Sequence, residues 1–137
     1  MATNFEVISD ALRLINVISE IDSPSAEQGT HGLRVLNDLM ESWTVDGVEL
    51  GWFTQTEATD DCPVTDGALL AVKTSLATTL ATTYGATITA ELGVMASNAY
   101  KTLVRNTVRD QSVPSDMSHM PLGEANFAGG YNIVTDE

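Results

Sequence analysis

The chain has 137 residues, which is the size of one ordinary folded domain, and 43% of these residues are hydrophobic. Six Lys and Arg residues against nineteen Asp and Glu residues give a net charge of −13, which argues against a general grip on nucleic acid because phosphate contacts need cations. The single cysteine, Cys62, excludes an internal disulfide and a cysteine-based zinc site, and its acidic neighbours predict a raised pKa and an unreactive thiol.

The strong acidity allows two interpretations. One is an ordinary acidic protein whose charge keeps it in solution, and the other is a surface that repels DNA, so that a duplex slides past without sticking. The N-terminus lacks the basic region of a secretory signal, and no apolar run approaches the roughly 18 residues of a membrane span. We therefore expect a protein made in a cytosol and without a membrane segment.

Two helices are predicted in the first third of the chain. Thr3 followed by Glu6, and Ser25 followed by Gln28, have the spacing of capping boxes, in which two residues bond reciprocally at a helix start. Behind each start, apolar residues recur every three or four positions, as one face of a helix requires. These residues are Phe5, Ile8, Leu12 and Ile15 in the first helix and Leu33, Leu36, Met40 and Trp43 in the second. Gly47 can supply the left-handed residue that ends the second helix.

A long connection follows the second predicted helix. Val48, Leu50 and Trp52 alternate with other residues, which predicts a short extended segment or hairpin. Residues 56–67 are polar and acidic and contain Pro63, which indicates a loop. Together they make a connection of about 20 residues, a length that is usually functional or mobile in a compact domain.

Two more helices are predicted, at about residues 66–83 and 87–110, with Gly85 between them. The third is rich in Ala and Thr, whose small side chains permit close approach and indicate the middle of a bundle or a subunit contact. The positions expected to face inward are Leu69, Val72, Leu76 and Leu80 in the third helix and Ile88, Leu92, Met95, Ala99 and Leu103 in the fourth.

From Val113 onward the helical periodicity is lost. Prolines and glycines interrupt the segment, which nevertheless keeps apolar and aromatic residues that a disordered end normally lacks. We interpret residues 113–137 as a docking arm. The predicted fold class is all-α: a small bundle of about four helices over residues 1–112, a short extended or hairpin loop after the second helix, and a long extended C-terminal arm.

The residues that carry catalytic or metal chemistry form no recognisable pattern. His31 and His119 lie far apart, outside any zinc-protease spacing. Asp60, Asp61 and Asp66 lack the regular spacing, turn glycine and distal Glu of a calcium loop, so solvated loop charge is the better interpretation. We expect no enzyme activity, no cofactor and no metal site. Two alternatives stay open: a small cell-wall-active hydrolase that uses acidic residues of the 57–66 loop, and an acidic regulator that binds a host protein.

One charged pattern stands out. Lys101, Arg105 and Arg109 follow one another at four-residue steps and so lie on one face of the fourth predicted helix. They are three of the six Lys and Arg residues in the chain. This basic stripe is either an ordinary solvated surface or a patch that meets acidic surface on a neighbouring copy or partner and orients assembly.

Four stretches carry a family resemblance. They are Ala11-Leu12-Arg13, then Leu36-Asn37-Asp38-Leu39-Met40-Glu41-Ser42-Trp43 followed by Asp46-Gly47-Val48, then the Ala- and Leu-rich third helix, and last Pro114-Ser115 with Met120-Pro121-Leu122-Gly123. Together they resemble the head-to-tail adaptor of P22-like tailed bacteriophages, also called the tail accessory factor or packaged-DNA stabilisation protein. The family's PS and MPxG elements are separated here by three extra residues, Met117 to His119.

The resemblance implies a structural virion protein that is made in the cytoplasm of the bacterial host. Members form a twelve-fold ring, a dodecamer, under the portal at the head-tail junction, where they extend the DNA channel, retain the packaged DNA and provide the tail attachment platform. The implied partners are the portal protein, further copies of the chain and a tail nozzle or hub protein. Packaged double-stranded DNA would pass through without sequence-specific binding.

The resemblance also implies roles for three groups of residues. The arm positions expected at the portal or a neighbouring subunit are Pro114, Ser115, Met117, Met120, Pro121, Leu122, Gly123, Phe127, Tyr131 and Ile133. The loop positions Val48, Leu50, Trp52 and Phe53 would lie near a ring or tail surface. The basic stripe would contact the neighbouring subunit.

Overall fold

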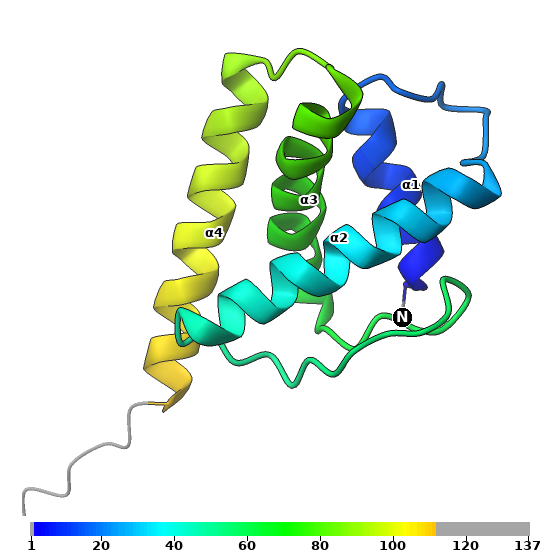
Figure 1. The fold of residues 1–137 in the computed structure, drawn as a ribbon. Helices are drawn as coiled ribbons and strands as arrows, with labels where there is room; N and C mark the ends of the chain where they lie inside the picture. The colour runs from blue at the N-terminus through cyan, green and yellow to red at the C-terminus, as the bar shows by residue number, and fades with distance from the viewer. Residues whose placement is uncertain (1, 112–137) are drawn as a thin grey trace, which may run out of the picture.

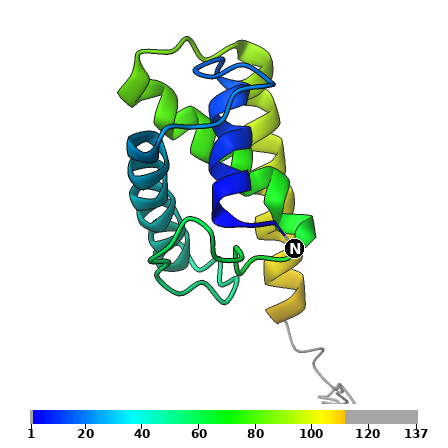
Figure 2. The ribbon, with the colours of Figure 1, turned by 90° about the vertical axis from the view of Figure 1, so that its right-hand side faces the viewer.

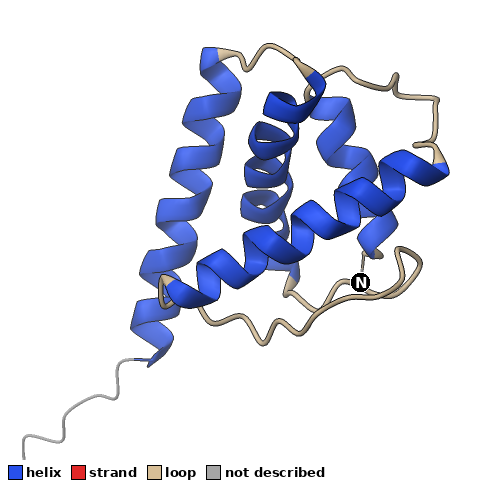
Figure 3. Ribbon diagram, in the orientation of Figure 1, coloured by secondary structure: helices blue, strands red, loops and turns tan. Residues whose placement is uncertain are grey.

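The computed structural model describes residues 2–111, and its elements run in the order α1 (Asn4–Leu14), α2 (Ala26–Val45), the short 3-10 helix η1 (Asp66–Ala68), α3 (Leu69–Tyr84) and α4 (Ala90–Gln111) (Figure 1). Residues 2–111 contain helices and loops but no strand, as the colouring of Figure 3 shows, and the predicted all-α class is confirmed. The predicted arm, residues 113–137, lies outside the described residues, and so does every arm position named above. The division into a bundle and an arm therefore stays a prediction.

The first two helices begin where their capping residues predict. Thr3 Oγ1 accepts a hydrogen bond from the Glu6 N–H, and Ser25 Oγ accepts one from the Gln28 N–H, both at 3.2 Å. The reciprocal bond forms at Ser25, whose N–H donates to Gln28 Oε1 at 2.9 Å. At the start of α1 the Glu6 carboxylate instead lies 3.4 Å from the Thr3 hydroxyl, so the capping box predicted there is half formed.

α3 is the central helix of the bundle. It contacts α1, α2 and α4, and Figures 1 and 2 show it between α1 and α4. Small side chains allow it to be buried on several sides at once. Its buried residues are Ala71, Val72, Thr74, Leu76, Ala77, Leu80 and Ala81. The predicted place in the middle of a bundle is confirmed, and so is the helix end, where Gly85 adopts a left-handed conformation with φ 66°.

α1 and α2 meet at a close crossing. A Cβ added to Gly32 would lie 2.6 Å from Ile8 Cγ2, a distance that real Cβ atoms do not adopt. Glycine lowers the intrinsic stability of a helix, yet here the missing side chain is what allows α2 to approach α1. Ile8 and Leu36 are both fully buried at this contact.

The connection from α2 to α3 is irregular. Of the two predicted forms, the hairpin is not made, and residues 48–53 run without a pairing strand. Side chains hold the backbone instead: Asn37 accepts a hydrogen bond from the Gln55 N–H and donates to the Gln55 carbonyl, both at 2.9 Å. The fully buried Asn4 donates to Gln55 Oε1, also at 2.9 Å. The bonds to Asn37 satisfy both backbone groups of Gln55, so this residue needs no ladder partner.

The fourth helix starts later than predicted and turns a different face to the core. The Thr89 hydroxyl accepts the Leu92 N–H at 3.1 Å and caps the first turn, so α4 begins at Ala90. Leu92 and Leu103 are buried as predicted. Ile88 and Met95 are exposed, at 43% and 42%, so their predicted burial is wrong. Ile88 precedes the first residue of α4, and Met95 lines an open groove instead of packing in the core.

Candidate assembly surface

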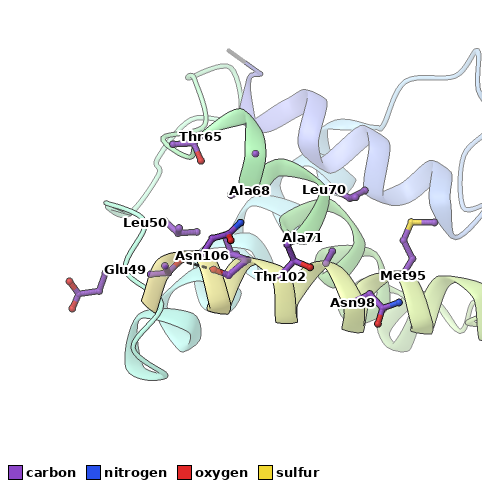
Figure 4. A pocket seen from close by; sticks show the side chains of 14 residues that line it. Glu49, Leu50, Thr65, Ala68, Leu70, Ala71, Met95, Asn98, Thr102 and Asn106 are labelled. Atoms are coloured by element: carbon purple, nitrogen blue, oxygen red, sulfur yellow. Dashed lines mark hydrogen bonds between the residues drawn. The ribbon is translucent and has the colours of Figure 1, made fainter. Parts of the chain in front are cut away.

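A groove of about 780 Å³ lies between the start of α3 and residues 95–107 of α4 (Figure 4). We call it the α3/α4 groove. Its apolar lining residues are Leu50, Ala68, Leu70, Ala71, Met95, Ala99 and Leu103. Its polar lining residues are Glu49, Thr65, Asn98, Thr102, Asn106 and Thr107, and Gly67 of η1 completes the lining.

The groove exists because small residues face one another across it. Ala68 and Ala71 on the α3 side and Ala99 on the α4 side cannot fill the space between their helices. Leu70 lines the groove but remains 55% exposed, and Met95 opposite remains 42% exposed. An exposed apolar lining with polar groups beside it is typical of a binding surface.

The basic stripe runs along α4 beside this groove. Lys101, Arg105 and Arg109 are all exposed, as are the apolar neighbours Val94 and Val108. Two further cations of the bundle are engaged at one carboxylate. Asp10 receives the Lys73 ammonium at 2.7 Å and the Arg13 guanidinium at 3.3 Å. Exposed positive charge is therefore concentrated on α4.

The outward side of α2 carries the opposite charge. Asp38 and Glu41 are exposed one turn apart, and Arg34 is the cation nearest to them along the helix. At the end of α2, Tyr100 of α4 donates a hydrogen bond to Asp46 Oδ2 at 3.4 Å, and its ring lies 5.1 Å from that of Trp43. Burial raises the pKa of Tyr100, and the charge of Asp46 raises it further. Trp43 and Tyr100 thus join the end of α2 to α4.

The predicted loop positions differ in burial. Val48 is buried in the core, and Trp52 is half-buried against it. Leu50 lines the groove, and Phe53 is 64% exposed. Of the four positions, Val48 belongs to the core, Leu50 and Trp52 are partly buried against it, and Phe53 is the most exposed to a partner.

The residues considered for chemistry have different surroundings in the described part of the chain: Cys62 is buried, His31 is half-buried, and Asp60 and Asp61 are exposed. Burial raises the pKa of the Cys62 thiol to about 11, so the predicted direction is correct. The predicted cause, the acidic neighbours, is wrong. His31 packs edge-on against Tyr84 with ring centroids 5.9 Å apart. Asp60 and Asp61 are exposed and lie outside the groove, and among residues 2–111 no group of three His, Cys, Asp or Glu residues is placed to hold a metal ion.

Sequence reasoning missed the groove, although a signal for one wall was present. Asn98, Thr102 and Asn106 recur at four-residue steps, each three positions before a member of the basic stripe. Such a polar row on the flank of an otherwise amphipathic helix marks a side that does not pack against the core. Leu70 gave no such signal, because a leucine in an Ala-rich helix is ordinarily buried.

Within residues 2–111, no helix is long and apolar enough to cross a membrane. A search among curated proteins finds no match to this chain. A family model described as P22 tail accessory factor matches residues 1–135. Because that match spans nearly the whole sequence, the chain belongs to the P22 tail accessory factor family and is a tail-associated structural protein of the phage virion.

Proposed function

We propose that this chain is the head-to-tail adaptor of its virion. Copies form a ring under the portal protein, extend the DNA channel, retain the packaged DNA and carry the distal tail. The observation that carries the proposal is the family match over residues 1–135. The distribution of charge and exposed apolar groups over the bundle supports it.

Two complementary faces favour a ring. Lys101 and Arg105 are exposed on the outward side of α4, whereas Asp38 and Glu41 are exposed on the outward side of α2. Figure 2 shows these helices toward opposite sides of the molecule. A subunit with unlike, complementary patches on two sides joins head to tail and closes into a ring when the rotation fits. We expect α4 of one copy to contact α2 of the next.

The net charge of −13 suits a channel for DNA. Like charge keeps phosphates from adhering to the wall, so that a duplex moves past without a tight contact. Cations placed in the subunit interface are not available to grip the passing DNA. The same arrangement that builds the ring therefore leaves its lumen acidic.

The arm and the loop supply the contacts along the ring axis in this proposal. Residues 113–137 bind the portal or a neighbouring copy, and exposed Phe53 lies at the surface offered to a tail nozzle or hub protein. An arm that becomes ordered on docking delays tight binding until its partner is present.

The proposal is tested by native mass spectrometry of the full chain alone and with purified portal protein. We expect a ring of adaptor copies on the portal. The double variant Lys101→Glu/Arg105→Glu should weaken assembly by about tenfold or more, because it sets like charges against each other. Lys101→Arg/Arg105→Lys is the matched control: it changes the same two side chains but keeps their charges, and assembly should persist.

Charge exchange separates a true α4–α2 contact from a general charge effect. The variant Asp38→Lys/Glu41→Lys should also assemble poorly alone. A mixture of the two double variants should assemble again, because alternating copies restore opposite charges at every contact. No recovery in the mixture would reject the α4–α2 contact, and no complex between wild-type chain and portal would reject the adaptor function itself.

A further inference from the structure

We infer that the α3/α4 groove is the docking site for residues 117–122 of the same chain, the stretch Met-Ser-His-Met-Pro-Leu, while no partner holds the arm. The inference concerns the free subunit and goes beyond the adaptor function. It assigns the groove an occupant and gives the arm a place in the unassembled protein.

The position of the chain end favours this occupant. α4 ends at Gln111, about one turn beyond Asn106 and Thr107 at one end of the groove. Residues 112–116 follow at once and include Pro114, a residue common just after a helix end and in turns. The chain can therefore reverse there and return along the groove.

The lengths also agree. The groove follows α4 from Met95 to Thr107, which is about 18 Å at the rise of an α-helix. Six residues in extended form cover about 20 Å. Residues 117–122 are therefore long enough to span the groove, and they follow closely after α4. A segment much farther along the arm would need a longer connection to reach the groove.

The side chains of the two surfaces are complementary. Met117, Met120 and Leu122 are flexible or branched apolar residues, and the groove offers them exposed Leu70 and Met95 over a floor of alanines. Methionine adapts well to irregular apolar surfaces. The amide and hydroxyl side chains along α4, those of Asn98, Thr102 and Asn106, can bond the backbone of an extended segment, which has no partner of its own.

Charge supports the same pairing. Residues 112–137 contain four acidic side chains and no Lys or Arg, and Asp116 and Glu124 flank the docking segment on its two sides. Lys101 and Arg105 are exposed on α4, each next in sequence to a lining residue, Thr102 and Asn106 respectively. Glu49 is the acidic residue of the lining, and Figure 4 shows its carboxylate turned away from the other lining side chains.

Attachment to the same chain favours the intramolecular contact over a contact with a second copy. A short connection gives the tethered segment an effective concentration in the millimolar range. A weak docking contact is then populated in the free subunit at any protein concentration. The portal would have to compete with the groove for the arm, which restrains the arm before assembly.

Disulfide trapping in the full chain tests the inference without any partner protein. Thr102→Cys places a thiol in the groove, and Met120→Cys places one in the docking segment. Ser97→Cys with Met120→Cys is the matched control, because Ser97 is an exposed residue of the same helix outside the groove. Cys62 is fully buried with a raised pKa and does not compete.

We expect the pair at positions 102 and 120 to close an internal disulfide about tenfold faster than the control pair, as measured by non-reducing electrophoresis and mass. Adding Leu70→Lys to the first pair should slow closure to near the control rate, because it removes an exposed apolar contact without opening the core. Equal rates for the two pairs, an unaffected rate with Leu70→Lys, or predominantly dimeric products would each overturn the inference. The outcome is independent of whether the chain binds a portal.

Discussion

Small residues have opposite effects at two helix contacts, that of α1 with α2 and that of α3 with α4. At the first, Gly32 allows Ile8 to approach so closely that a Cβ would lie 2.6 Å from Ile8 Cγ2. At the second, alanines face one another across a groove of about 780 Å³, with Leu70 and Met95 left exposed. We call the first the closed contact and the second the open contact.

The difference lies in what the neighbouring helix supplies. Opposite Gly32 stands a bulky branched side chain that fills the space, so the small residue produces close packing. Opposite Ala68 and Ala71 stand Ala99 and polar side chains, so the small residues leave space that a partner can occupy. The closed contact is therefore built for stability, and the open contact is available for binding.

The largest expected effect comes from a comparison of two leucines of α3. Leu76 is fully buried, and Leu76→Ala should lower the free energy of unfolding by about 2–5 kcal/mol, because it leaves a cavity among packed helices. Leu70 is 55% exposed at the open contact, and Leu70→Ala should change it by less than about 0.5 kcal/mol. Urea unfolding of both variants followed by circular dichroism measures the difference. Similar losses would mean that Leu70 is packed as firmly as Leu76, contrary to its exposure.

Replacing either of two glycines by alanine should change the stability by an intermediate amount, with opposite signs at the two positions. Gly32→Ala should destabilise the protein by about 1–3 kcal/mol, because Ile8 must move from a fully packed position. Gly93→Ala on α4 should stabilise it by about 0.5–1 kcal/mol, since nothing lies within 4 Å of the added Cβ and alanine favours the helix. Thermal unfolding of the two variants beside wild type measures both changes. A gain in stability for Gly32→Ala would contradict the tight crossing.

Local signals in the sequence were sufficient for the two helices of the closed contact, but not for their crossing at Gly32. Thr3 and Ser25 predicted the two helix starts, and the three- and four-residue spacing predicted buried Ile8, Leu12 and Leu36. These features depend on neighbours within one or two turns. They are accordingly readable from a short stretch of chain.

The open contact depends on which side of a helix has a neighbour, and no local pattern contains that information. Met95 fits the apolar face of α4 by spacing, yet it lies exposed because α3 covers a different side. Val48 fits a strand by alternation, yet it is buried in the core and belongs to an irregular loop. Asn37 accepts a hydrogen bond from the backbone of this loop at Gln55. The cause of the Cys62 pKa shift was missed for the same reason, since burial is a tertiary property.

The smallest expected effect is on the pH dependence of stability and concerns Cys62. This residue is fully buried, and its backbone N–H donates a hydrogen bond to the Ala2 carbonyl beside the start of α1. Burial raises the pKa of its thiol from 9.0 to about 11. The folded chain therefore holds this proton more tightly than the unfolded chain. The resulting contribution to stability is complete below pH 9 and is lost as the pH rises through about 11.

We expect the free energy of unfolding of the wild-type chain to fall between pH 9 and about 11, and that of Cys62→Ala to fall less steeply. Burial also raises the pKa of Tyr84 and of Tyr100, which act in the same direction, but both tyrosines remain in the two proteins, so the difference in slope reports Cys62. Urea unfolding at neutral pH and at several values across this window measures the slopes. The packing loss from removing the sulfur shifts the whole curve of the variant without changing its slope. Parallel curves would mean that water reaches the thiolate in the folded chain, and the enclosure of Cys62 beside α1 would then be wrong.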